Sequence, residues 1–180
     1  MSESRWLSSQ KVALFIDLPN QSGLDMEWIV NTALKYGKLE VAWGYGRFHH
    51  HNDGLSHMVE QLRRLGVRLI HCPDFGYGQN DMTDLYMMRD IYHTLVQRPE
   101  IDCFVVCTGD GDFADVITTV RAHGRKVVVI GPPDATSRQL ARVADQCLIG
   151  PLSSPGSRIS HVARQPCIGG QDSGGNGRSR

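Results

Sequence analysis

The sequence lacks the features that mark membrane-spanning, secreted and strongly basic proteins. No apolar run approaches the roughly eighteen residues that suggest a membrane-spanning helix, and the polar first ten residues lack the apolar stretch of a secretory signal. The formal net charge is zero, so any basic surface that attracts nucleic acid must be local. We therefore expect a cytoplasmic protein without a membrane partner.

Metal-binding cysteine patterns are missing as well. The five cysteines form no CxxC pair, and Cys103 and Cys107 are spaced so that they share one face of a strand. Burial as reduced thiols is therefore expected in preference to zinc binding. The chain has 180 residues, of which 41% are hydrophobic and 21% charged, as in a soluble globular protein with one core.

Short apolar runs alternate with amphipathic segments between residues 11 and 150. The apolar runs predict strands at 11–17, 38–48, 67–72, 101–107, 126–131 and 146–150. Helical spacing of apolar residues predicts helices at 24–37, 54–66, 81–97, 113–124 and 137–144. This alternation predicts a three-layer α/β/α domain, Rossmann-like, with a central and mainly parallel sheet.

Two terminal segments fall outside that pattern. Residues 1–10 read as an N-terminal extension. Residues 151–180 are dominated by Gly, Ser, Pro and Arg and have too little apolar surface to form a core, so we expect a flexible tail. The tail is mildly basic, and a solvated tail is expected in preference to a weak contact with RNA.

Aspartates follow two of the expected strands. Asp17 ends the first strand, and Asp110 and Asp112 lie in the TGDGD loop after IDCFVVC. Because parallel strands end at one edge of a sheet, these carboxylates should share that edge. Ionised pairs about 4 Å apart repel by roughly 4 kcal/mol at an effective dielectric near 20, which a proton or a divalent cation would relieve. Oxygen ligands favour Mg²⁺ or Mn²⁺ over zinc, although Asp112 alone is also explained as a helix N-cap.

Polar and small residues surround these aspartates. Gly109 and Gly111 flank Asp110 and predict unusual backbone torsions and close approach of a ligand. Thr108 either orients a ligand or water or is satisfied by the local backbone. Asn20 either holds a water or phosphate oxygen or forms an Asx-turn.

With these residues assembled, the sequence resembles the NYN domain family of PIN-like ribonucleases over about residues 11–150. The motifs are KVALFIDLPN, TDLYMMRDI and DCFVVCTGDGDFADVITTVRAHGRKVVVIG. The resemblance implies a metal-dependent endoribonuclease that hydrolyses RNA phosphodiester bonds with Mg²⁺ or Mn²⁺. It implies catalytic and metal-binding roles for Asp17, Asp84, Asp110 and Asp112, and substrate binding by Asn20 and Thr108.

The middle motif departs from the family pattern. A basic residue usually stands shortly before the helical aspartate, whereas this chain has GQNDMTD. Asp81 competes with Asp84 for the role of the helical aspartate. Asp84 resembles the family pattern better, because Leu85, Met88 and Asp90 then follow it at the spacing found in the family. Asp90 is expected at the helix surface or behind the metal ligands.

RNA binding requires contacts beyond the metal. Candidate cations are Arg47, His49, His50, His51, Arg63, Arg64, Arg121 and Arg125, and Tyr45, Phe48 and Tyr77 either stack on bases or pack in the core. An RNA-binding or regulatory module with little or no catalysis is the alternative function. A phosphatase-like hydrolase is disfavoured, because no second aspartate stands two residues after Asp17. The sequence leaves a homodimer possible.

Overall fold

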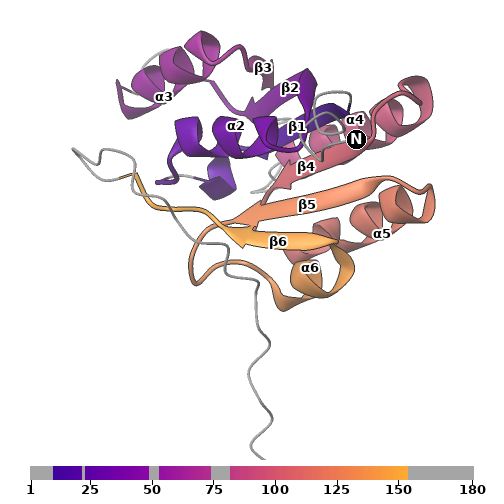
Figure 1. Cartoon of the computed structure of the whole chain (residues 1–180). Helices are drawn as coiled ribbons and strands as arrows, with labels where there is room; N and C mark the ends of the chain where they lie inside the picture. The colour runs from indigo at the N-terminus through magenta and orange to yellow at the C-terminus, as the bar shows by residue number, and fades with distance from the viewer. Residues whose placement is uncertain (1–9, 22, 49–52, 74–81, 154–180) are drawn as a thin grey trace, which may run out of the picture.

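A six-stranded parallel sheet forms the centre of the computed structural model, which describes residues 10–21, 23–48, 53–73 and 82–153 (Figure 1). The strands are β1 (Lys11–Asp17), β2 (Lys38–Gly46), β3 (Arg68–His71), β4 (Cys103–Cys107), β5 (Lys126–Gly131) and β6 (Gln146–Ile149). They lie in the order β3-β2-β1-β4-β5-β6, and every pair is parallel. The predicted parallel α/β fold is confirmed.

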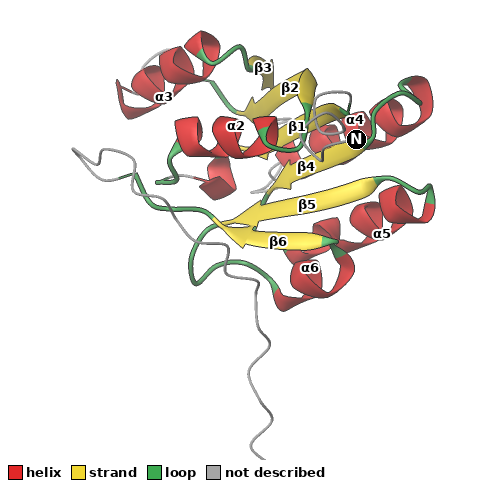
Figure 2. Ribbon diagram, viewed as in Figure 1, coloured by secondary structure: helices red, strands yellow, loops and turns green. Residues whose placement is uncertain are grey.

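Helices cover both faces of this sheet (Figure 2). One face packs against α2 (Met26–Leu34) and α3 (Asp53–Arg64), and the other against α4 (Thr83–Gln97), α5 (Ala114–Ala122) and α6 (Arg138–Val143). Two short 3₁₀ helices, η1 (Pro19–Gln21) and η2 (Gly111–Phe113), follow β1 and β4. Successive side chains of β1 alternate between the layers: Ala13 and Phe15 face α4–α6, whereas Leu14 and Ile16 face α2 and α3.

Apolar runs become strands here because the central strands are covered on both faces. All residues of β4, and all but the first of β1 and β5, are buried. The predicted elements are all present, with ends that differ by a few residues. For example, α2 begins at Met26 rather than near residue 24, because the Asp25 carboxylate accepts the Trp28 N–H at 3.0 Å and caps the helix.

The first residues of the expected tail are held by the domain. Leu152 forms an antiparallel bridge with Leu24, and Ser153 donates its N–H to the Gly23 carbonyl at 2.6 Å. Asp25 donates its N–H to the Pro151 carbonyl at 3.1 Å. Residues 151–153 therefore belong to the folded part, and the remainder of the expected tail lies outside the described residues.

The described cysteines are buried free thiols, as predicted; Cys167 lies outside the described residues. Burial raises the pKa of the Cys103 thiol to about 12 and that of the Cys107 thiol well above its usual value. Both thiols therefore stay protonated. Within the described ranges, no helix is long and apolar enough to cross a membrane.

The strand order places a topological switch between β1 and β4. From β1 the chain proceeds outward to β2 and β3, and after α4 it resumes on the other side of β1 with β4, β5 and β6. In open α/β sheets, ligands bind outside the carboxyl ends of the strands at such a switch. The residues that end β1 and follow β4 are therefore the first place to search for a site.

Candidate functional site

A buried carboxylate and a buried hydroxyl meet at the switch point. Asp17 ends β1 and is 1% exposed, and Thr108 directly follows β4 and is fully buried. Thr108 Oγ1 donates to Asp17 Oδ2 at 3.1 Å. The alternation of β1 puts Asp17 on the same face as Ala13 and Phe15, which is the face covered by α4 and α5. One hydrogen bond thus joins the two strands at the predicted edge.

Asn20 supplies a second donor to the same oxygen. It lies in η1, is exposed at the surface, and donates its Nδ2–H to Asp17 Oδ2 at 2.7 Å. A buried carboxylate is costly unless hydrogen bonds replace its hydration. Asn20 and Thr108 provide two of them, so the carboxylate is held in one orientation at the end of β1.

The loop after β4 continues this chain of hydrogen bonds. Thr108 Oγ1 accepts the Asp110 N–H at 3.1 Å, and Asp110 Oδ1 accepts the Asp112 N–H at 3.0 Å. The first of these bonds satisfies the backbone N–H of Asp110, which is one of the two roles predicted for Thr108. The bond to Asp17 in addition links the end of β1 to the residue after β4. The alternative explanation of Asp112 as a helix N-cap is wrong, because Asp110 is the N-cap of η2 and Asp112 lies exposed in its first turn.

The two glycines of this loop are explained by close packing. A Cβ on Gly109 would lie 2.5 Å from the Ala135 carbonyl oxygen, and one on Gly111 would lie 2.8 Å from Ser137 Oγ. Neither glycine has a positive φ, so the expected torsional reason is wrong. The glycines allow the connection from β5 to α6 to approach, and Ser137 donates its N–H to the Gly109 carbonyl at 2.9 Å.

Asp84 approaches the same edge from α4. It lies half-buried in the first turn, three residues before Met87 and seven before Ile91, both of which pack in the layer that contains Phe15. This spacing puts Asp84 on the sheet-facing side of the helix. The helix runs back toward the amino ends of the strands, where Arg98 reaches Glu40 of β2, so its first turn lies at the carboxyl edge.

Comparison with known proteins identifies the family. The family model of the NYN domain matches residues 11–152. The chain belongs to the NYN domain family. This NYN domain is 27% identical over 139 residues to the uncharacterized protein MJ0482 of Methanocaldococcus jannaschii, which covers 75% of this chain and 53% of that protein. The chain therefore spans about half the length of that curated relative.

A solved structure has the same fold. The crystal structure of a protein of unknown function, VPA0982 from Vibrio parahaemolyticus RIMD 2210633, superposes with a TM-score of 0.68 at 21% identity, over 83% of this chain and 95% of that chain. At this identity the likeness shows the fold alone. NYN domains are generally RNA-related nucleases of PIN-like fold, and such nucleases typically use divalent metals.

The site of this NYN domain offers ligands that suit a hard cation. Asp17 ends β1, Asp110 and Asp112 follow β4, and Asp84 lies in the first turn of α4, while the hydroxyl of Thr108 and the amide of Asn20 contact Asp17. Oxygen donors of this kind fit Mg²⁺ or Mn²⁺. The ligand chemistry therefore fits, although among the described residues no three Asp, Glu, His or Cys side chains are grouped as they would be around an ion. Asp81, the rival of Asp84, lies outside the described residues.

Asp90 has a role that the sequence did not reveal. It is 8% exposed rather than on the helix surface, and its carboxylate accepts the Tyr45 hydroxyl at 3.1 Å and pairs with Arg89 at 2.7 Å. Tyr45 lies beside Asp17 in the register of β1 and β2. Burial and the Asp90 charge raise the pKa of the Tyr45 hydroxyl well above its usual value. The ring is fully buried and does not stack on bases.

Among the candidate RNA contacts that the structure describes, those near β5 lie away from this site. Phe48 is half-buried against the His71 ring, with centroids 6.2 Å apart. Arg121 ends α5 and Arg125 precedes β5, so both lie at the opposite, amino edge of the sheet. Strand direction alone would have placed them there. Of the other candidates, Arg63 and Arg64 are exposed at the end of α3, Arg47 is half-buried after β2, and His49, His50, His51 and Tyr77 lie outside the described residues.

Proposed function

We propose that this NYN domain is a metal-dependent endoribonuclease that hydrolyses RNA phosphodiester bonds at the carboxyl edge of its sheet. The observation that carries the proposal is the buried Asp17 carboxylate, held at the switch point by Thr108 and Asn20. A structural aspartate at a strand end is commonly the N-cap of the next helix. Asp17 is instead buried at the position where open α/β sheets bind ligands.

Each residue of the site has a proposed role. Asp17, Asp84, Asp110 and Asp112 would hold Mg²⁺ or Mn²⁺, which when bound supplies an activated water and stabilises charge on the scissile phosphate. Thr108 and Asn20 fix the orientation of the Asp17 carboxylate through its Oδ2 atom. Asn20, which is exposed, would also offer its amide to the substrate phosphate, whereas the buried Thr108 would act through Asp17. The loop containing Asp110 is kept in place by its own cap and by the packing of Gly109 against residue 135.

An RNA-binding or regulatory module with little catalysis is the second candidate. One oxygen of Asp110 is engaged by the Asp112 N–H, and the acidic side chains that the structure describes are not gathered into a group of three. The segment GQNDMTD also has no basic residue ahead of Asp84. These features fit a site that recognises RNA without cleaving it.

A cleavage and binding assay separates the two candidates. Labelled single-stranded RNA is incubated with the protein and Mn²⁺ or Mg²⁺, alongside Asp17→Asn and Asp110→Asn. Asparagine caps helices as well as aspartate does, so Asp110→Asn removes the charge and keeps the η2 cap. Asp115→Asn is the matched control, because Asp115 is exposed in the first turn of α5.

The nuclease proposal expects metal-dependent cleavage by the unmodified protein and by Asp115→Asn, and loss of cleavage in the two site variants. RNA binding without cleavage by any of the four proteins would support the second candidate. Cleavage that persists in both site variants, or that needs no metal, would overturn the proposed site.

A further inference from the structure

A basic hollow lies at the amino edge of the sheet, opposite the Asp17 site. Its volume is about 430 Å³, and it is lined by Arg121, Gly124, Arg125, Lys126 and Asp145. These residues come from the end of α5, the turn into β5 and the residue before β6. Since β1 has seven residues that each rise about 3.3 Å, the hollow is roughly 20 Å from the carboxyl edge.

One wall of the hollow is fixed by a bridged carboxylate. Arg121 pairs with Asp145 at 2.7 Å and donates to the Val143 carbonyl at 2.8 Å. The second oxygen of Asp145 accepts the Val127 N–H at 2.8 Å. Asp145 is thus fully engaged by Arg121 and the backbone of β5, and its charge is compensated within the fold.

Arg125 and Lys126 contribute two further positive charges to the hollow. Both are half-buried, and Lys126 Nζ lies 4.7 Å from the centroid of the Tyr36 ring. Within the described part of the chain, neither side chain makes an ion pair with a carboxylate. The Tyr36 hydroxyl is bonded to Gln146, which holds the ring beneath the ammonium group.

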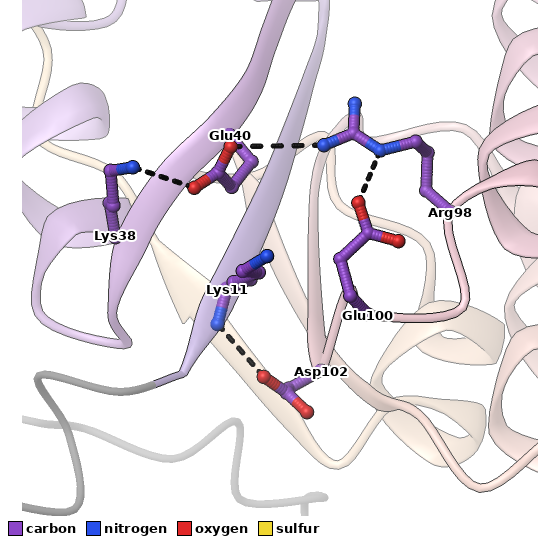
Figure 3. A network of polar contacts seen from close by, with 6 residues as sticks. All are labelled: Lys11, Lys38, Glu40, Arg98, Glu100 and Asp102. Carbon is purple, nitrogen blue, oxygen red and sulfur yellow. Dashed lines mark hydrogen bonds and ion pairs between the residues drawn. The ribbon is translucent and has the colours of Figure 1, made fainter.

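Neighbouring acids at this edge already have other partners: Glu40 and Glu100 pair with cations, and the Asp102 carboxylate accepts the Lys11 N–H at 2.8 Å. Figure 3 shows Glu40 between Lys38 and Arg98, and Glu100 beside Arg98. Hydrogen bonding and the charges of Lys38 and Arg98, respectively, lower the pKa of Glu40 and of Glu100, so both are ionised and satisfied by these partners. These two carboxylates therefore pair with Lys38 and Arg98 and not with Arg125 or Lys126.

Among the described residues, the Asp17 site and the basic hollow thus differ in the sign of their charge. The carboxyl edge carries Asp17, Asp84, Asp110 and Asp112, and the amino edge carries the basic hollow. A polyanion is repelled by the first edge and attracted by the second. Arg125 and Lys126 both line the hollow, and guanidinium and ammonium groups each donate hydrogen bonds to phosphate oxygens.

We infer that the hollow between α5, β5 and β6 binds a phosphate group through Arg125 and Lys126, apart from the Asp17 site. The phosphate belongs either to the backbone of RNA or to a small phosphorylated molecule. In the first case the hollow anchors an RNA strand at a distance from the carboxyl edge. In the second it is a ligand site of its own.

The test compares the full chain with the double variant Arg125→Gln/Lys126→Gln. The matched control is Arg138→Gln/Arg142→Gln, which removes two exposed arginines from α6 and the same total charge. Binding of fluorescein-labelled single-stranded RNA is measured in EDTA over a range of salt concentrations. Binding of inorganic phosphate and of AMP is measured by isothermal titration. Since no divalent metal is present, loss of the proposed nuclease activity has no effect on these readings.

Each phosphate contact that is lost should make the slope of log affinity against log salt shallower by about 0.7. A shallower slope in the hollow variant, but not in the control, supports the inference and identifies RNA as the source of the phosphate. An unchanged RNA slope with loss of phosphate or AMP binding supports it with a small molecule as the source. Unchanged binding of all three probes overturns it. The charge-preserving variant Arg125→Lys/Lys126→Arg should bind as the unmodified protein does, and an unchanged circular dichroism spectrum of Arg125→Gln/Lys126→Gln excludes a folding defect.

Discussion

Replacing Thr108 by valine tests the side-chain hydrogen bond between Thr108, after β4, and Asp17, at the end of β1. The substitution nearly keeps the volume of a fully buried side chain but removes the hydroxyl that donates to Asp17 and accepts from the Asp110 N–H. A bond to a charged group contributes about 1.5–3 kcal/mol, and an unpaired buried donor costs about 1–3 kcal/mol. Asp110 is only half-buried, so water replaces part of the second loss.

We expect Thr108→Val to lower the free energy of unfolding by about 3 kcal/mol. For a domain of this size that corresponds to a fall in Tm of about 6–12 °C. Urea unfolding followed by circular dichroism measures the change. Thr108→Ser keeps the hydroxyl and removes one methyl group, so it should cost only about 1 kcal/mol.

A double-mutant cycle with Asp17→Asn isolates the bond itself. A neutral acceptor reduces the contribution of the hydroxyl to about 0.5–1.5 kcal/mol. Thr108→Val should therefore cost less in the Asp17→Asn protein than in the unmodified one, by at least about 1 kcal/mol. Equal costs in both proteins, or a cost of Thr108→Val no larger than that of Thr108→Ser, would refute the role given to this bond.

Three further predictions concern the surroundings of the site. Gly109→Ala should destabilise the domain by about 1–3 kcal/mol and weaken cleavage, because the added Cβ would lie 2.5 Å from the Ala135 carbonyl; unchanged thermal unfolding would contradict the packing described. The raised pKa of the Tyr45 hydroxyl keeps it protonated when folded, so its contribution to stability is complete below about pH 10 and is lost as the pH rises above that value. Tyr45→Phe should flatten that alkaline loss in urea unfolding measured against pH. Cys103 and Cys107 should resist a thiol reagent in the native state and react in urea, and rapid native labelling would contradict their burial.

Much of the architecture was predictable because its signals are local. Strands buried on both faces read as apolar runs, and helices read as apolar residues at helical spacing, so the alternation implied a parallel sheet. Strand direction then placed Asp17 and Thr108 at one edge. Strand direction also places Arg125 at the opposite edge, although Arg125 was counted among the candidate RNA contacts of the site.

Other features depended on residues far apart in the chain. The packing of Gly109 depends on Ala135, and the burial of Asp90 depends on the Tyr45 hydroxyl. Such contacts leave no periodic pattern in the sequence, since only the folded chain decides which loop approaches which. The N-cap of η2 illustrates the same point over a shorter range. Aspartate is a preferred N-cap residue, so both Asp110 and Asp112 are suitable, and the backbone conformation after β4 places Asp110 at the cap.

The layers, the direction of the strands and the edge at which Asp17 and Asp110 lie could thus be predicted from the sequence, because they follow from hydrophobic periodicity and chain order. The tertiary structure alone decided that Asp17 is buried and held by Thr108 and Asn20, and that Arg125 and Lys126 share a hollow with a bridged Asp145. Those outcomes depend on distances between side chains of different elements. Such distances are set by the packing of the whole core.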